Sequence, residues 1–149
     1  MRDLAATLAL VDEVAGANGG LDFFFANAGI ALGGPTHELT PEHWDRMIDV
    51  NLRGAVNSVL AAYPAMREQG RGHMVLTASG AGLAPPPFVV PYAMAKHGVV
   101  GLGVGLRPEA ALAGVHVSVL CPGPVDTPIL DRAPPADLPA TASPTLTAR

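Results

Sequence analysis

Apolar residues recur at helical spacing in three stretches of the chain. In the first stretch they stand three or four positions apart from Leu4 onward, until a group of glycines at 16, 19 and 20 ends the pattern. The second begins at Thr40 and Pro41, which suit the cap and the first turn of a helix. The spacing therefore predicts a helix from Leu4 to these glycines, and two further helices over 40–70 and 91–114.

Short apolar runs without helical period separate these helices and predict buried strands over 21–26, 73–79 and 115–120. Because the intervening helices are long enough to be crossovers, we expect an α/β protein with a parallel sheet and helices on both of its faces. Ligands bind such sheets beyond the carboxyl ends of the strands. Asn27, Ser79 and Pro122-Gly123 stand at those ends, so the pattern brings three segments to one edge.

Composition narrows the classes of function. The 149 residues suit one domain, 49% of them are hydrophobic, and the net charge of −4 argues against nucleic acid or an anionic membrane as a partner. A single cysteine, Cys121, cannot form an internal disulfide, and the five histidines show no spacing typical of a metal site. The amino terminus lacks the pattern of a signal peptide, and the apolar stretch 98–106 is far shorter than the roughly 20 residues of a spanning helix. We therefore expect a soluble, cytoplasmic protein without a metal.

Tyr92 and Lys96 are four residues apart on a predicted helix, so their side chains share a face. A free tyrosine has a pKa of about 10 and is a poor base at neutral pH, whereas a nearby ammonium group favours the phenolate. Such a tyrosine can exchange a proton with an alcohol or a carbonyl oxygen. Taken alone, the pair is more often an ordinary tyrosine and lysine one helical turn apart.

Two other polar residues are candidates for the same site. Ser79 closes a predicted strand, where its hydroxyl could bond a reacting oxygen or simply begin a turn. Asn51 and Gly54 both weaken the predicted helix around them. A local distortion that frees a backbone group for a water is one explanation, and a tolerated polar helix position is the other.

Five motifs in register resemble the short-chain dehydrogenase/reductases of the single-domain type. The resemblance covers roughly residues 1–132, and it is carried by Asn27-Ala28-Gly29, Val50-Asn51-Leu52-Arg53-Gly54, Ser79, Tyr92-Ala93-Met94-Ala95-Lys96, and Pro122-Gly123 with Thr127. It implies a partial doubly wound, Rossmann-like sheet and NAD(P)-dependent interconversion of an alcohol and a carbonyl. It also implies a homo-oligomer that pairs through the helices 40–70 and 91–114.

The resemblance assigns a role to each residue of these motifs. Tyr92 is expected to be the general acid/base, and Lys96 to lower its pKa and bind the nicotinamide ribose. Ser79 is expected to bind and polarise the substrate oxygen, and Asn51 to hold a water in a proton relay. The other expected cofactor contacts are Asn27, Ala28, Gly29, Pro122, Gly123, Val125 and Thr127.

The chain departs from the family pattern at both ends. The resemblance implies a first strand, a glycine-rich turn and a helix that hold the cofactor pyrophosphate, and a last strand, and we find neither in this sequence. We therefore expect residues 1–132 to be the catalytic half of the domain. Residues 133–149 are expected to be a shortened substrate loop or a disordered tail, in a chain that derives from a truncated reading frame.

Two alternatives to a dehydrogenase stay open. The chain could be a non-catalytic fragment or an interaction module, since both long helices are present. An epimerase or a dehydratase also fits Tyr-x-x-x-Lys, but Asn27-Ala28-Gly29 and Val50-Asn51 resemble the dehydrogenases more closely. Neither the substrate nor the choice between NAD and NADP follows from the sequence.

Overall fold

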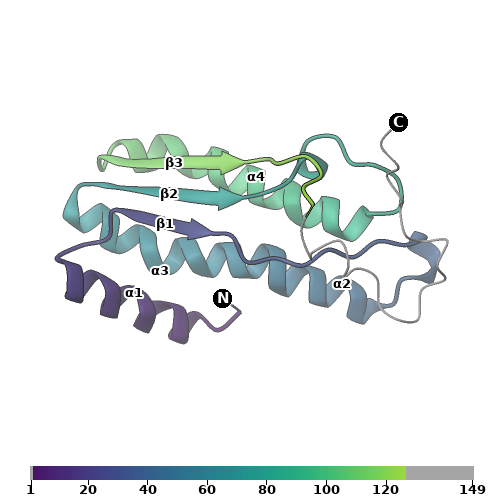
Figure 1. Ribbon diagram of the computed structural model, residues 1–149, viewed down its shortest axis with the longest axis horizontal. Coiled ribbons are helices and arrows are strands. Elements are labelled where there is room, and N and C mark those ends of the chain that lie inside the picture. Colours follow the sequence, from purple (N-terminus) through teal and green to yellow (C-terminus); the bar gives the residue numbers. More distant parts are fainter. Residues whose placement is uncertain (1, 127–149) are drawn as a thin grey trace.

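A computed structural model describes residues 2–126 of the chain, so Thr127 and the segment 133–149 lie outside the described residues. Three parallel strands form one sheet in the order β1-β2-β3 (Figure 1). The strands are β1 (Phe23–Ala26), β2 (Gly72–Thr77) and β3 (Val115–Leu120). The α/β class and the partial doubly wound parallel sheet are thus confirmed. β1 begins two residues later than predicted, β2 begins one residue earlier and ends two residues earlier, and β3 has its predicted bounds.

The helices occupy the three predicted stretches. They are α1 (Leu4–Asn18), α2 (Pro41–Met47), α3 (Gly54–Gln69) and α4 (Val90–Ala111), with short helical turns η1 (Thr36–Glu38) and η3 (Gly80–Gly82) in the loops. Between α2 and α3 lies η2 (Ile48–Arg53), a π-helical segment. The stretch predicted as a single helix over 40–70 is therefore helical without a break from Pro41 to Gln69. Its hydrogen-bond register changes within the π-helical segment.

Local sequence explains where the helices begin and end. The Asp3 carboxylate accepts a hydrogen bond from the Ala6 amide at 3.0 Å and so caps α1. Gly19 and Gly70 end α1 and α3 with φ values of 69° and 71°, a left-handed conformation in which glycine has no steric penalty. Pro91 lies in the first turn of α4, where its missing N–H costs no hydrogen bond.

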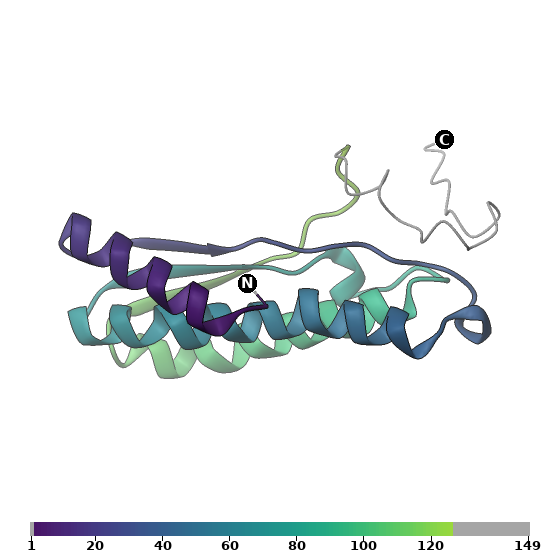
Figure 2. The same cartoon turned by 90° about the horizontal axis from the view of Figure 1, so that it is seen from below.

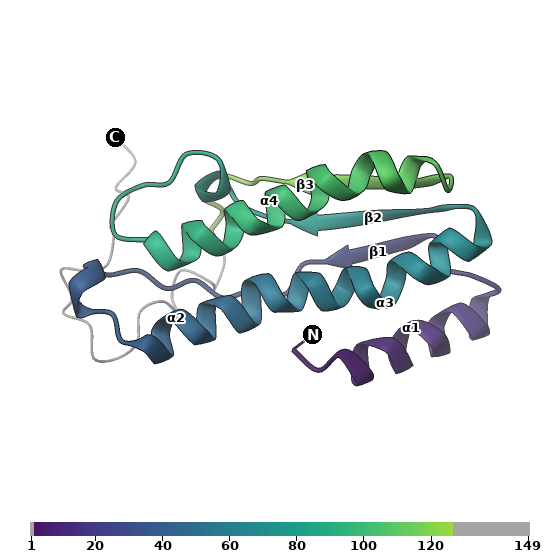
Figure 3. The same cartoon turned by 180° about the vertical axis from the view of Figure 1, so that it is seen from behind.

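The long helices all cover the same face of the sheet, which differs from the expectation of helices on both faces (Figures 2 and 3). The reason lies in the strand order. Both crossovers, from β1 to β2 and from β2 to β3, step in the same direction, and right-handed crossovers that step in one direction place their helices on one side. Of the two helical layers of a doubly wound fold, residues 2–126 thus provide one.

The core lies between this helical layer and the sheet. Met74 and Leu76 of β2 point into it and are fully buried, as is Val99 of α4. Their neighbours across the sheet are Phe24 and Ala26 of β1, which pair with Met74 and Leu76 in register and belong to the same core cluster. The alternation of inward and outward side chains along each strand sets which residues reach the helices.

The other face of the sheet carries aromatic side chains that no described helix covers. Phe23 and Phe25 are 61% and 60% exposed. Phe23, His73 and His116 form a row across the three strands, with ring centroids 5.8 Å apart at each step. Phe23 and Phe25 are therefore largely exposed on this face, whereas Phe24 packs against the core. Among residues 2–126, no helix has both the length and the apolar character needed to cross a membrane.

Candidate active site

The carboxyl ends of the three strands lie at the same edge of the sheet (Figure 1), and the segments after β2 and β3 are hydrogen-bonded to each other. The Ala78 amide donates to the Leu120 carbonyl at 2.8 Å, which extends the pairing of β2 with β3. Two residues farther on, the Gly80 amide donates to the Pro122 carbonyl at 2.7 Å. The segment after β3 is thereby held beside the segment that contains Ser79.

Helix α4 presents Tyr92 and Lys96 from its first two turns. The Lys96 ammonium nitrogen lies 5.8 Å from the centroid of the Tyr92 ring, so the two side chains share a face as their spacing predicts. Tyr92 is partly buried and packs with a small apolar cluster that includes Leu32, Met47 and Ala95. These contacts fix the position of the ring.

Lys96 is the most unusual side chain in the site, because it is charged and only 4% exposed. Its Nζ donates to the Thr77 carbonyl at 2.8 Å, which joins α4 to the end of β2. Burial lowers the pKa of Lys96 to about 8, because removing an ammonium group from water disfavours the charged form. A lysine in this state can hold or release a proton close to neutral pH.

Asn51 lies in the π-helical segment η2 and is 2% exposed. Its side-chain amide forms two hydrogen bonds with the backbone of Ile30, accepting from the amide and donating to the carbonyl, both at 2.9 Å. The register change is visible in the bond from the Gly54 amide to the Asp49 carbonyl, which spans five residues instead of four. The local distortion, one of the two explanations for Asn51, is thus present in the structure.

Gly29 allows the loop after β1 to approach Asn51 and Lys96 closely. A Cβ atom at this position would lie 2.8 Å from Asn51 Oδ1 and 3.5 Å from Lys96 Nζ. Only a residue without a side chain leaves room for the pairing of Asn51 with the Ile30 backbone. Gly29 therefore packs the loop that follows β1 against the π-helical segment and α4.

Ser79 is the cap of the short helical turn η3, which directly follows β2. Its Oγ accepts a hydrogen bond from the Ala81 amide at 3.2 Å. A hydroxyl has one hydrogen to donate, and this bond leaves that hydrogen available. Ser79 thus lies two residues beyond the observed end of β2 at Thr77, whereas the sequence predicts it as the last residue of a strand over 73–79.

The remaining predicted site residues that the structure describes lie at the same edge of the sheet and are exposed to solvent. Asn27 and Ala28 follow β1 and are exposed. Pro122, Gly123 and Val125 follow β3 and are exposed as well, with Pro122 tied to Gly80 through its carbonyl. The described structure therefore brings Asn51, Lys96 and Gly29 into contact and sets Tyr92 beside Lys96, whereas Asn27, Ala28 and Val125 lie exposed at the same edge.

Two residues of the site, Thr77 and Ile30, were not predicted from the sequence because they contribute backbone atoms. The Thr77 carbonyl accepts from Lys96, and both backbone groups of Ile30 pair with Asn51. Every residue type carries these atoms, so no side-chain pattern could have indicated them. The order β2, turn, α4 was the one available signal for Thr77, since it brings the end of the strand near the helix.

Comparison with known proteins places this arrangement in a family. The family described as "short chain dehydrogenase" matches residues 1–137 of the chain. The chain belongs to the short-chain dehydrogenase family. Proteins of this family that resemble it are NAD(P)-dependent oxidoreductases of alcohols and ketones.

The relatives resemble the chain over most of its own length. D-beta-hydroxybutyrate dehydrogenase of Rhizobium meliloti (strain 1021) is 38% identical over 114 residues, which are 76% of this chain and 44% of the relative. The crystal structure of levodione reductase matches with a TM-score of 0.82 and 36% identity, covering 86% of this chain and 50% of that one. A short chain dehydrogenase from Mycobacterium paratuberculosis bound to NAD gives a TM-score of 0.82 at 36% identity, covering 86% of this chain and 48% of that one. The chain thus spans about half the length of the relatives it matches.

Proposed function

We propose that this short-chain dehydrogenase chain provides the hydride-transfer half of an NAD(P)-dependent site that interconverts a small alcohol and its carbonyl compound. The observation that supports this proposal most directly is the buried Lys96 ammonium beside Tyr92, held by the Thr77 carbonyl. A charge that is 4% exposed costs stability, and such an arrangement is typical of a functional site.

Tyr92 is proposed as the group that exchanges a proton with the substrate oxygen. In alcohol oxidation its phenolate accepts the hydroxyl proton, and in carbonyl reduction its phenol donates a proton to the oxygen. Lys96 lies on the same helix face, with its ammonium nitrogen 5.8 Å from the centroid of the Tyr92 ring. When bound, NAD(P) accepts or supplies the hydride, and the protein contributes position and electrostatics.

Ser79 is proposed to orient the substrate oxygen. Its Oγ already accepts a bond from the Ala81 amide, and its own hydrogen is available for another acceptor. A carbonyl or alcohol oxygen near Tyr92 would be such an acceptor. A donated hydrogen bond to an oxygen that gains negative charge during reduction lowers the barrier.

Asn51 is proposed to hold a water through its backbone, because its side chain is already committed. The Asn51 side chain bonds both backbone groups of Ile30 and also donates to Met47 Sδ, which fixes the π-helical segment against the loop after β1. A π-helical register leaves a backbone carbonyl without its usual partner, and such bulges occur often at functional sites. A water on this carbonyl would connect Lys96 with solvent.

The donor groups of Lys96 and Tyr92 fit the nicotinamide end of the cofactor. Lys96 has three N–H groups and uses one on Thr77, so it can also bind a ribose hydroxyl together with Tyr92. The exposed segments at the strand ends are proposed to line the cofactor on either side; their residues are Asn27, Ala28, Gly29, Pro122, Gly123 and Val125, and Thr127 outside the described part. The choice between NAD and NADP stays open.

Titration with each dinucleotide tests this proposal. The chain is expected to change the fluorescence of NADH or of NADPH at millimolar concentrations, and Lys96→Met is expected to weaken that binding. Arg46→Met is the matched control, since Arg46 is exposed on α2. No binding of either dinucleotide at millimolar concentration would contradict the proposal that this chain holds the cofactor.

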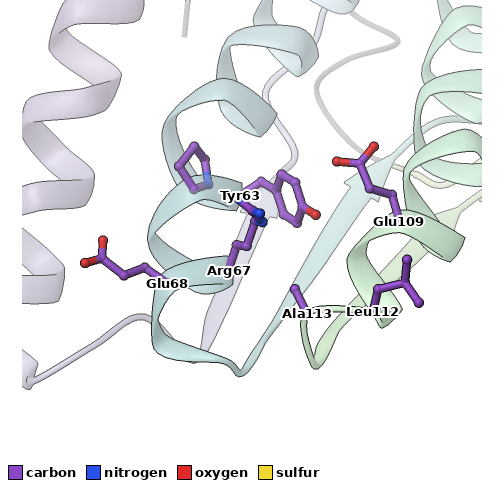
Figure 4. Close-up of a pocket in the computed structure, with 7 residues that line it drawn as sticks. Tyr63, Arg67, Glu68, Glu109, Leu112 and Ala113 are labelled. Carbon is purple, nitrogen blue, oxygen red and sulfur yellow. The ribbon is translucent and has the colours of Figure 1, made fainter.

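A second candidate function, an interaction module, is favoured by the outer face of α3 and α4. Figure 4 shows a hollow between these helices, lined by Tyr63, Arg67, Glu109, Leu112 and Ala113 among others. Leu112, the residue that directly follows α4, is 91% exposed, and Val104 within α4 is 53% exposed. We propose that this face pairs with a second copy of the chain, which is the predicted mode of homo-oligomerisation.

Changing the charge of this face tests the pairing. Val104→Glu is expected to shift the chain from dimer to monomer in sedimentation equilibrium, because a carboxylate buried between helices lacks a partner. Leu8→Glu on α1, at a position 39% exposed, is the control and should leave the dimer intact. A monomeric chain at all concentrations would contradict the pairing and leave the proposed chemistry unaffected.

A further inference from the structure

The turn η3 follows β2 and contacts both the segment after β3 and helix α4. It begins with Ser79, and the Gly82 amide donates to the Ser79 carbonyl at 2.8 Å, which closes the turn. The Gly80 amide binds the Pro122 carbonyl at 2.7 Å and thereby fixes the turn to the segment after β3. The turn is therefore a compact unit, and its position sets the position of the Ser79 hydroxyl.

Gly82 is the point at which this unit touches α4. It is buried, and a Cβ atom built there would lie 2.8 Å from the Lys96 carbonyl oxygen, 2.9 Å from the Lys96 carbonyl carbon and 3.3 Å from the His97 amide nitrogen. All three atoms belong to the helix backbone, which cannot move aside as a flexible side chain can. The turn thus lies directly on the backbone of the residue that carries the buried ammonium group.

We infer that Gly82 is a positioning residue, which sets the distance between the Ser79 hydroxyl and the Tyr92–Lys96 pair by allowing η3 to rest on the α4 backbone. This inference rests on the proposed hydride-transfer site. Ser79 and Tyr92 must reach the same substrate oxygen, one from the turn and one from the helix. A displacement of about 1 Å at such a site can lower a rate about 100-fold.

The test compares three alanine variants of the full chain. Gly82→Ala should push η3 away from α4 and lower kcat by about 10- to 100-fold, while the Kd for the dinucleotide changes little. Gly105→Ala is the open control, since a Cβ there meets nothing within 4 Å. Gly103→Ala is the packing control, because its Cβ would collide with Val119 in the core. The packing control should lower Tm without a selective loss of kcat.

A double-mutant cycle separates positioning from a general structural role. If Gly82 acts through Ser79, Gly82→Ala should cost much less in kcat when Ser79 is already alanine, because there is no hydroxyl left to misplace. Equal losses in both backgrounds would overturn the inference. So would a Gly82→Ala variant with unchanged kcat.

Two readouts keep the inference testable without enzymatic activity. The turn lies next to the end of β2, where Thr77 binds Lys96, so moving it should hydrate the ammonium group and raise its pKa from about 8. Lys96 is the only lysine in the chain, so its ¹³Cε resonance can be titrated without ambiguity. An unchanged Lys96 pKa in folded Gly82→Ala would count against the inference.

The second readout needs no variant and covers the case in which Gly82→Ala does not fold. In the unmodified chain, the Gly82 and Gly80 amides should exchange hydrogen at least 100-fold more slowly than free amides, since both are bonded within a docked turn. Free exchange at both amides would overturn the inference. If these readouts agree with it but no carbonyl compound is reduced, the proposed function fails while the positioning of η3 by Gly82 stands.

Discussion

Replacing Tyr92 by phenylalanine is expected to lower the rate of carbonyl reduction by about 100- to 10,000-fold, the usual contribution of a general acid/base. The substitution removes one hydroxyl group and keeps the ring, which packs with Leu32, Met47 and Ala95. Tm should therefore change by little. The rate should be measured with saturating dinucleotide and ketone, so that weaker binding does not imitate slower chemistry.

The chain offers a matched control for this experiment. Tyr63 is the only other tyrosine, and it lies in the hollow between α3 and α4, away from the strand ends. Tyr63→Phe should leave the rate unchanged. Equal rates for wild type and Tyr92→Phe would contradict the proposed role of Tyr92.

Replacing Lys96 by methionine is expected to stabilise the fold at pH 7 while removing the site's chemistry. Burial lowers the pKa of Lys96 from 10.5 to about 8, and each unit of pKa corresponds to about 1.4 kcal/mol, so the buried charge costs roughly 3 kcal/mol. Losing the hydrogen bond to the Thr77 carbonyl lowers the free energy of unfolding by about 1 kcal/mol. The free energy of unfolding should therefore rise by about 2 kcal/mol.

The pH dependence of this difference follows from the direction of the pKa shift. Between about pH 8 and pH 10.5 the unfolded chain binds the lysine proton and the folded chain does not, so the stability of the wild type rises with pH in that range. The difference in the free energy of unfolding between Lys96→Met and wild type should be largest below pH 8. It should become smaller as the pH approaches 10.5.

Urea unfolding at pH 7 and pH 10 measures both effects, with Arg46→Met as the control for loss of an exposed charge. A Lys96→Met chain that is less stable than wild type at pH 7, by the same amount at both pH values, would show that the ammonium group stabilises the fold. Stability gained at the cost of function is the expected signature of an active-site residue.

Spacing along the chain predicted those parts of the structure that local patterns determine. The three strands and the long helices stand where the apolar periodicity places them, and Tyr92 and Lys96 share a helix face. The arrangement of helices on one face could not be read from periodicity, because it depends on the direction in which successive crossovers step across the sheet.

Backbone contacts account for the rest of what sequence left unpredicted. A distortion was one of two explanations for Asn51, and the π-helical segment is present, but no sequence pattern indicated that the Asn51 side chain bonds the Ile30 backbone. Gly29 and Gly82 matter because of the atoms that a Cβ would meet, and those atoms come from segments distant in sequence. Such close approaches exist only once the chain has folded.

The central claim, that this chain holds a hydride-transfer site built on Tyr92 and Lys96, is tested most directly by following one hydrogen. The chain should be incubated with a small ketone and with NADH or NADPH that carries deuterium at the reactive carbon of the nicotinamide. The account predicts deuterium on the carbinol carbon of the product, in amounts at least 100-fold lower with Tyr92→Phe. Deuterium in the product at equal rates with wild type and Tyr92→Phe, or none with wild type under conditions in which the dinucleotide is bound, would contradict it.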